Sequence, residues 1–292
     1  MKKCLILTAA VLFATGVFAQ NTPELNPASE NGHTHHYPAF GFVDPFAAFA
    51  RPGQNPTYHG GNVIRNARVV LIFWGPSFAS GGSDAGYAAA VQSFRNQYGT
   101  NPEYNVITQY YGSDPISGYG NIAQSNLATG TADWFDTSTP PKNVTDSTVQ
   151  SEVLRYLSSH TFDNNTVYEV FIPSASYSSD GTATSCGGPH LTYCAYHGSF
   201  SNGGRDIKYA IEPYPSCSGC QASGFSTVQN VEHFICHETR EAVTDPDLNA
   251  WYDRSGNELD DKCAWSPAPF IVNGFGYQYE WSNSAGGCVK SQ

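Results

Sequence analysis

The chain of 292 residues carries a net charge of −11, and only 13% of its residues are charged. An acidic chain of this kind is a poor partner for phosphate backbones and anionic lipid surfaces, which argues against nucleic-acid binding and electrostatic membrane attachment. Its length allows one large domain or two small ones.

The first segment has the layout of a cleavable export signal. Two lysines precede an apolar run at residues 5–18, and Ala19 supplies the small residue of a cleavage site. The run is too short to span a bilayer after processing, and no later segment has the apolar length of a membrane helix. We therefore predict a signal peptide at residues 1–19, a secreted and monomeric protein, and no membrane insertion.

Residues 20–57 show no clear hydrophobic period and are rich in proline, asparagine, alanine and phenylalanine. This composition predicts a flexible or surface-wrapping leader. His33, His35 and His36 lie within it; a solvated tail is the favoured interpretation, and loose metal binding is the alternative. A single α/β domain is predicted over residues 58–292.

Within that domain, hydrophobic patterning alternates between strands and helices. A capping-box pattern at Ser226 opens the last helix and Pro246 ends it. Alternation of this kind favours a mixed β-sheet covered by helices on both faces, followed by a loop-rich C-terminal part supported by disulfides. Strands are predicted at residues 68–74, 106–111, 167–172 and 206–211, the last of them at a sheet edge, and helices at residues 83–98, with Gly99 as C-cap, 146–157 and 227–245.

Cysteines outside the signal are expected to pair in an oxidising compartment. Short spacings predict the local bridges Cys186–Cys194 and Cys217–Cys220. A third bridge between positions 263 and 288 would tie down the C-terminal segment, and Cys236 would remain a buried free thiol. A zinc knuckle at positions 217 and 220 is the less favoured alternative, since no second close Cys/His pair stands at the required spacing.

The last helix carries the sequence His237-Glu238-x-x-Glu241. At about 100° per residue, His237 and Glu241 lie one turn apart on one side of the helix, where they can share a metal ion. Glu238 lies beside them and can act as general base on a metal-bound water. This is the geometry of the zincin helix His-Glu-x-x-His with a glutamate in place of the second histidine. The alternative is a surface helix with solvated glutamates.

A third ligand must come from beyond the helix. Asp247 stands ten residues after His237, and further aspartates follow in the stretch before Cys263. Other histidines rank lower, because a structural hydrogen bond is the favoured role for His197 and His59, and His233 is expected to be exposed. The candidates for the third ligand are Asp247, Asp253, Asp260 and Asp261.

Ordered motifs over roughly residues 58–281 resemble the EXORDIUM-like, or phosphate-induced protein 1, family of secreted proteins from plants and some bacteria. The resemblance implies a single extracellular domain linked to cell-wall-associated growth, without implying a reaction. It favours Asp261 as third ligand; Asp260 departs from the glycine usual there. The matching segments are Tyr58-His-Gly-Gly61, Val70-Leu-Ile-Phe-Trp-Gly75, Phe94 with Gln97-Tyr-Gly99, Gln109-Tyr-Tyr111, Tyr193-Cys-Ala-Tyr-His197, Tyr209-Ala210 with Pro213, Cys217 with Cys220, His237-Glu-x-x-Glu241, Asp245-Pro246, Asn249-Ala-Trp-Tyr252 and Glu258-x-x-Asp261-x-Cys263.

These observations lead to one main hypothesis, a secreted zincin-like metallohydrolase acting as a peptidase. Zn²⁺ would be held by His237, Glu241 and Asp261, and Glu238 would be the general base. The alternative is a non-enzymatic extracellular signalling or cell-wall glycan-binding protein with a structural metal, for which Ca²⁺ is a candidate. A glycoside-active enzyme using paired carboxylates is a third possibility.

Overall fold

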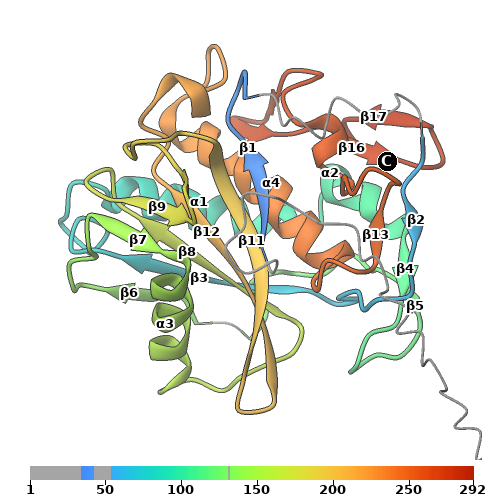
Figure 1. Ribbon diagram of the computed structural model, residues 1–292, viewed down its shortest axis with the longest axis horizontal. Coiled ribbons are helices and arrows are strands. Elements are labelled where there is room, and N and C mark those ends of the chain that lie inside the picture. Colours follow the sequence, from blue (N-terminus) through green and yellow to red (C-terminus); the bar gives the residue numbers. More distant parts are fainter. Residues whose placement is uncertain (1–33, 43–53, 131) are drawn as a thin grey trace, which may run out of the picture.

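The computed structural model describes residues 34–42, 54–130 and 132–292, so the predicted signal peptide lies outside the described residues. Its centre is a six-stranded mixed sheet (Figure 1). Among the first three strands each neighbouring pair is antiparallel, and the remaining strands run parallel to the third. In spatial order the strands are β1 (Thr34–Pro38), β11 (Tyr193–Asn202), β12 (Arg205–Pro213), β8 (Thr166–Ile172), β3 (Arg68–Trp74) and β6 (Trp134–Asp136).

Helices cover both faces of this sheet, which confirms the predicted α/β fold class (Figure 1). Alternate residues of β3 point to opposite faces. Leu71 and Phe73 pack with α1 and α4, whereas Val70 and Ile72 pack with α3. No helix in the described ranges combines the length and apolarity that a bilayer crossing demands. The helices are α1 (Ala85–Tyr98), α2 (Pro102–Asn105), α3 (Asp146–Leu157) and α4 (Thr227–Thr244).

The helices with strong periodicity lie where the sequence places them. Helix α3 has the predicted bounds. Helix α4 begins with the predicted capping box, in which the Ser226 hydroxyl accepts from the Gln229 amide and the Gln229 side chain accepts from the Ser226 amide. Gly99 follows α1 in a right-handed conformation and lies so close to Ser125 that a β-carbon would meet its carbonyl oxygen at 2.2 Å.

Two strand predictions are corrected. The strand at residues 106–111 is wrong: Asn101 caps α2 and Pro102 starts it, and the helical path continues as the 3₁₀ helix η2 (Val106–Gln109). The segment at residues 206–211 is a strand, but not an edge strand, because β11 and β8 flank it. Its polar positions, Asp206 and Lys208, lie toward the outer end of the β11–β12 hairpin.

The edge strand next to β11 is β1, and it corrects the prediction of a flexible leader over residues 20–57. Residues 34–38 pair antiparallel with β11, and the side chains of His35 and His36 are buried rather than solvated. His33 lies outside the described residues. Residues 57 and 58 also form a strand, β2 (Thr57–Tyr58), which pairs with β13 (Trp251–Tyr252). The folded unit therefore includes part of the predicted leader.

Short strand pairs and three disulfides organise the loop-rich regions among the described residues. The local bridges predicted from spacing are wrong, because Cys186 and Cys194 reach instead across to Cys217 and Cys220, respectively. The predicted third bridge and the buried free Cys236 are confirmed. The short strands are β7 (Asn143–Thr145), β9 (Tyr177–Asp180), β10 (Ala183–Thr184), β4 (Tyr111–Gly112), β5 (Gly120–Asn121), β14 (Phe270–Val272), β15 (Phe275–Tyr277), β16 (Glu280–Ser282) and β17 (Gly287–Val289).

The Cys263–Cys288 disulfide ties β17 to the 3₁₀ helix η4 (Asp261–Cys263). Its loop spans 25 residues. Replacing both cysteines by serine is expected to lower the free energy of unfolding by about 3 kcal/mol, because the unfolded chain regains loop entropy. Urea titration followed by tryptophan fluorescence measures this loss. Cys236→Ala is the control, and an equal loss there would show that the effect comes from cysteine packing rather than from the bridge.

Candidate metal centre

The residues predicted as metal ligands lie together between α4, β11, β1 and η4. His237 Nε2 is 2.9 Å from Glu241 Oε2, one helical turn away, and 3.8 Å from Asp261 Oδ1. The ligand atoms of these three residues all lie within 4.8 Å of one another. The geometry is therefore compatible with one ion held by the predicted set.

The other candidates for the third ligand are engaged elsewhere. Asp260 forms a buried ion pair with Arg240, a residue that the sequence did not single out. Asp247 pairs with Lys208, and Asp253 accepts from Lys262 at 2.9 Å. Asp261, and not its neighbour Asp260, is therefore the aspartate that faces His237.

Three further side chains join the cluster. His35 Nε2 of β1 is 2.6 Å from Asp261 Oδ2, and its Nδ1 is 3.3 Å from Glu258 Oε2. His197 of β11 lies opposite His35 in the strand register, with Nε2 3.6 Å from Glu258 Oε2. These side chains form two more groups with metal-ligand spacing. One is His35 with Glu241 and Glu258, and the other is His197 with Glu238 and Glu241. Glu241 therefore belongs to all three groups of the cluster.

Hydrogen bonds from neighbouring residues orient two of the predicted ligands, Glu241 and His237, toward the cluster. Glu241 Oε1 accepts from the backbone amides of Asp260 and Asp261 at 3.1 and 3.0 Å, which leaves Oε2 facing His237. The side-chain amide of Gln278 lies against His237 Nδ1, with its oxygen at 3.4 Å and its nitrogen at 3.3 Å, and its nitrogen also donates to Asp260. With Nδ1 held by Gln278, Nε2 is the ring nitrogen that faces Glu241 and Asp261, the position from which it could bind a metal.

Buried polar atoms without hydrogen-bond partners mark the same place. Among the described residues these include Nε2 of His197 and of His237, Oε2 of Glu241 and both carboxylate oxygens of Glu258. Leaving such atoms unpaired in the protein interior is costly, and a cation is the partner that ring nitrogens and carboxylates share. The cluster contains the imidazoles of His35, His197 and His237. Imidazole ligands favour zinc or another transition metal over Ca²⁺, which prefers oxygen ligands alone.

The pKa values agree with a crowded acidic site. Burial first, and then the charge of Asp261, raise the pKa of Glu241 well above its usual range. Burial lowers the pKa of His35, but the charge and hydrogen bond of Asp261 outweigh it and bring the pKa to about 9. Burial would raise the pKa of Asp261, but the charge and hydrogen bond of His35 outweigh it and bring the pKa to about 2. Burial lowers the pKa of His237 to about 4, so its ring is neutral, as a ligand must be.

Zinc binding at pH 7 is therefore expected to release protons. The pKa of His35 is raised to about 9, so its ring carries a proton at pH 7 without metal, and a cation beside it displaces that proton. The raised pKa of Glu241 acts in the same direction. The apparent affinity for zinc should rise as pH rises toward 9. Isothermal titration calorimetry in buffers with different ionisation enthalpies measures the released protons, and a binding heat that is the same in every buffer would contradict the prediction.

Glu238 points from α4 toward the sheet and is completely buried. Its Oε2 lies within hydrogen-bond distance of His197 Nδ1, at 3.1 Å. Burial, followed by the charges of Glu212 and Glu241, raises the pKa of Glu238 well above its usual range. A carboxyl group with a raised pKa beside a metal site is the usual form of a general base or acid.

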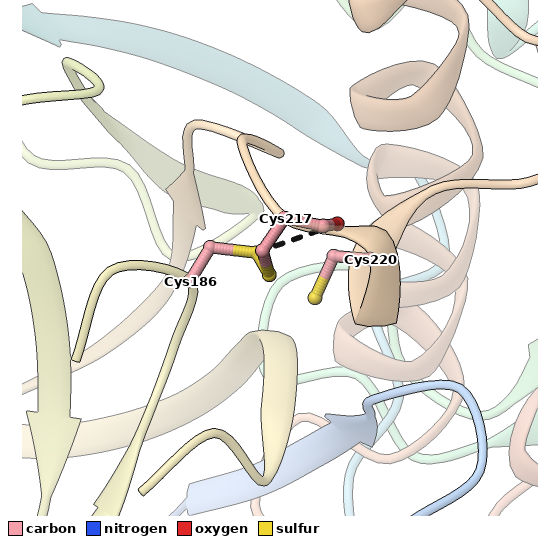
Figure 2. A group of neighbouring side chains, drawn as sticks. All are labelled: Cys186, Cys217 and Cys220. Carbon is pink, nitrogen blue, oxygen red and sulfur yellow. Dashed lines mark hydrogen bonds between the residues drawn. A yellow bond between two sulfur atoms is a disulfide. The ribbon is translucent and has the colours of Figure 1, made fainter. Parts of the chain in front are cut away.

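A cluster of sulfur atoms at Cys186, Cys217 and Cys220 also meets metal-ligand spacing. It is not a zinc knuckle, because Cys186 and Cys217 are joined by a disulfide (Figure 2). The third cysteine, Cys220, forms a disulfide with Cys194. Oxidised sulfurs are not the thiolates that bind zinc. The alternative of a zinc knuckle is therefore wrong.

The two remaining histidines that the sequence singled out lie outside the cluster. His59 stacks on Tyr252 with ring centroids 3.7 Å apart and contacts its carbonyl oxygen, as expected of a structural residue. His233 is buried, not exposed, because Tyr37 and Trp265 pack over it. The periodicity of α4 did not reveal this, since β1 and the C-terminal loops cover that side of the helix.

Comparison of the chain with protein-family models, with curated proteins and with solved structures finds no match. The resemblance to the EXORDIUM-like family stays a prediction from the motifs. The function is therefore inferred from the cluster itself.

Proposed function

We propose that the protein is a secreted zincin-like metallohydrolase whose substrates are extracellular peptides. The observation that carries the proposal is the convergence of buried ring nitrogens and carboxylate oxygens at metal-ligand spacing around the His237-Glu238-x-x-Glu241 turn. Disulfides of the kind seen here persist in oxidising compartments, which supports secretion.

His237, Glu241 and Asp261 would hold the ion. A bound Zn²⁺ would polarise the peptide carbonyl and lower the pKa of water. Glu238 would accept the proton of the attacking water and return it to the departing amine nitrogen, so that its carboxylate is restored after each turnover. His197, whose Nδ1 is hydrogen-bonded to Glu238, would keep that side chain in place.

Access to the site is narrow in this structure. His237, Glu238 and Glu241 are completely buried, and the side chains of His35 and Asp261 are 10% and 12% exposed. Hydrolysis by the wild-type chain is therefore expected to be slow. The test is a mixed peptide pool incubated with zinc-loaded protein and analysed by mass spectrometry for new termini; cleavage that stops with a chelator and returns with zinc supports the proposal.

The same enclosure favours a second candidate function, a non-enzymatic extracellular binding protein with a structural metal. Tyr111 and Tyr119, 36% and 65% exposed, form an aromatic surface with Tyr58 that suits a cell-wall glycan. Unfolding on chelation, without hydrolysis of any peptide, would favour this function.

A further inference from the structure

Strand β1 is unusual for a buried edge strand. Among the described strands it pairs with β11 alone. Its first three residues, Thr34, His35 and His36, are polar, yet each residue as a whole is at most 8% exposed. A strand that serves only as core would be expected to carry apolar residues there. Its polar side chains instead meet specific partners on both faces.

On the face toward α4, β1 covers the metal centre. His35 reaches Asp261 and Glu258, as described above, and its ring lies 5.9 Å from that of His197. Two residues on, the ring of Tyr37 lies 4.4 Å from that of His237. An extended chain thus runs directly across the residues that would bind the ion.

Tyr37 fills an aromatic pocket beside the centre. Trp265 stacks on it at 5.3 Å, Phe234 meets it edge-on at 5.4 Å, and its hydroxyl lies 3.4 Å from His233 Nδ1. The indole of Trp265 also donates to the carbonyl of Pro38 at 2.7 Å. The pocket therefore recognises both an aromatic side chain and the backbone that follows it.

Main-chain pairing to a sheet edge, with alternate side chains in pockets, is how extended peptides bind to open sheets. We propose that β1 occupies the groove in which an extended peptide substrate pairs with β11, and that it is an intramolecular inhibitor with His35 across the metal centre. The Tyr37 pocket then selects substrates with an aromatic residue. The inhibitory part of this inference rests on the proposed hydrolase function; the binding part rests on β1 alone.

The test releases β1 without touching the centre. On the opposite face of the strand, His36 Nε2 lies 3.1 Å from Asp180 and its ring stacks on Tyr193. His36→Ala in the full chain should increase the population with β1 undocked on the order of tenfold. The double variant with Thr34→Val, which also removes a hydroxyl that donates to Asp180, extends the release. His59→Ala is the matched control, since it removes a histidine stacked on a tyrosine away from β1.

Hydrogen exchange reports whether residues 34–38 are released, and elemental analysis reports zinc. The expected result is faster exchange, retained zinc, about tenfold faster peptide hydrolysis, and binding of a labelled peptide with the sequence of residues 34–42 that the wild type does not bind. The same peptide with alanine at the Tyr37 position should bind more weakly.

The remaining outcomes separate the two proposals. Release of β1 with retained zinc but no gain in hydrolysis and no binding of the peptide would overturn the inference. Binding of the peptide by the released chain, with no hydrolysis in any variant, would leave the groove in place and overturn the hydrolase function. Binding that is equal for the tyrosine and alanine peptides would overturn the selectivity for an aromatic residue.

Discussion

Wild-type protein, purified with its disulfides formed, is expected to carry about one zinc ion per chain, and His237→Ala to carry almost none. His237 offers a neutral ring nitrogen that is buried and aimed by Gln278, so its loss removes the ligand best prepared for the ion. Elemental mass spectrometry of the two proteins, after dialysis against a zinc buffer, makes the comparison.

His233→Ala is the control for removing a buried histidine from α4. It lies one turn before His237 and contacts Tyr37, but it takes no part in the groups with metal-ligand spacing. The control should keep its zinc. Equal zinc content in His237→Ala and wild type, or none in wild type, would remove the basis of the hydrolase proposal and place the binding-protein function first.

Glu238→Gln is expected to keep zinc and lose at least about 100-fold in peptide hydrolysis, because the amide has no basic oxygen to accept a proton from water. The same loss is expected when Glu238→Gln is made in the wild-type chain and when it is made in His36→Ala. It is easier to measure in His36→Ala, because the starting rate of hydrolysis there is expected to be higher. Initial rates on the peptide pool, with zinc content measured on the same samples, test the prediction.

Glu232→Gln is the matched control, another buried glutamate of α4, which accepts from the amide of Gly276 at 2.7 Å and lies outside the cluster. Its rates should stay within a few-fold of the parent. Hydrolysis that survives in Glu238→Gln would refute the general-base role. Cleavage of sugar polymers by that variant after metal removal would point instead to a glycoside-active enzyme.

The sequence predicted the parts of the fold that local patterns determine. Residues 68–74 form a buried strand because their run is apolar on both faces, and residues 146–157 form a helix with a clear 3.6-residue period. Residues 106–111 show the opposite case: their apolar side chains suit a strand, but Pro102 and the Asn101 cap set the backbone on a helical path first.

The site was predictable only where its residues are close in sequence. The helical turn at His237 and Glu241 follows from spacing, and Asp261 was identified through the resemblance. Glu258 shares the Glu258-x-x-Asp261 motif and could have been added from it. His35 gave no such signal, because its place depends on pairing between β1 and β11, and the actual partners of Cys186 and Cys194 depend on the same long-range packing.

The hydrogen bond between His35 and Asp261 joins residues 226 positions apart. Contacts at such a separation form late, because a long loop must close before they contribute any stability. A chain that is still being synthesised contains His35 well before it contains Asp261. The three proposed ligands, His237, Glu241 and Asp261, are close in sequence, so β1 is expected to cover the centre only after they have come together.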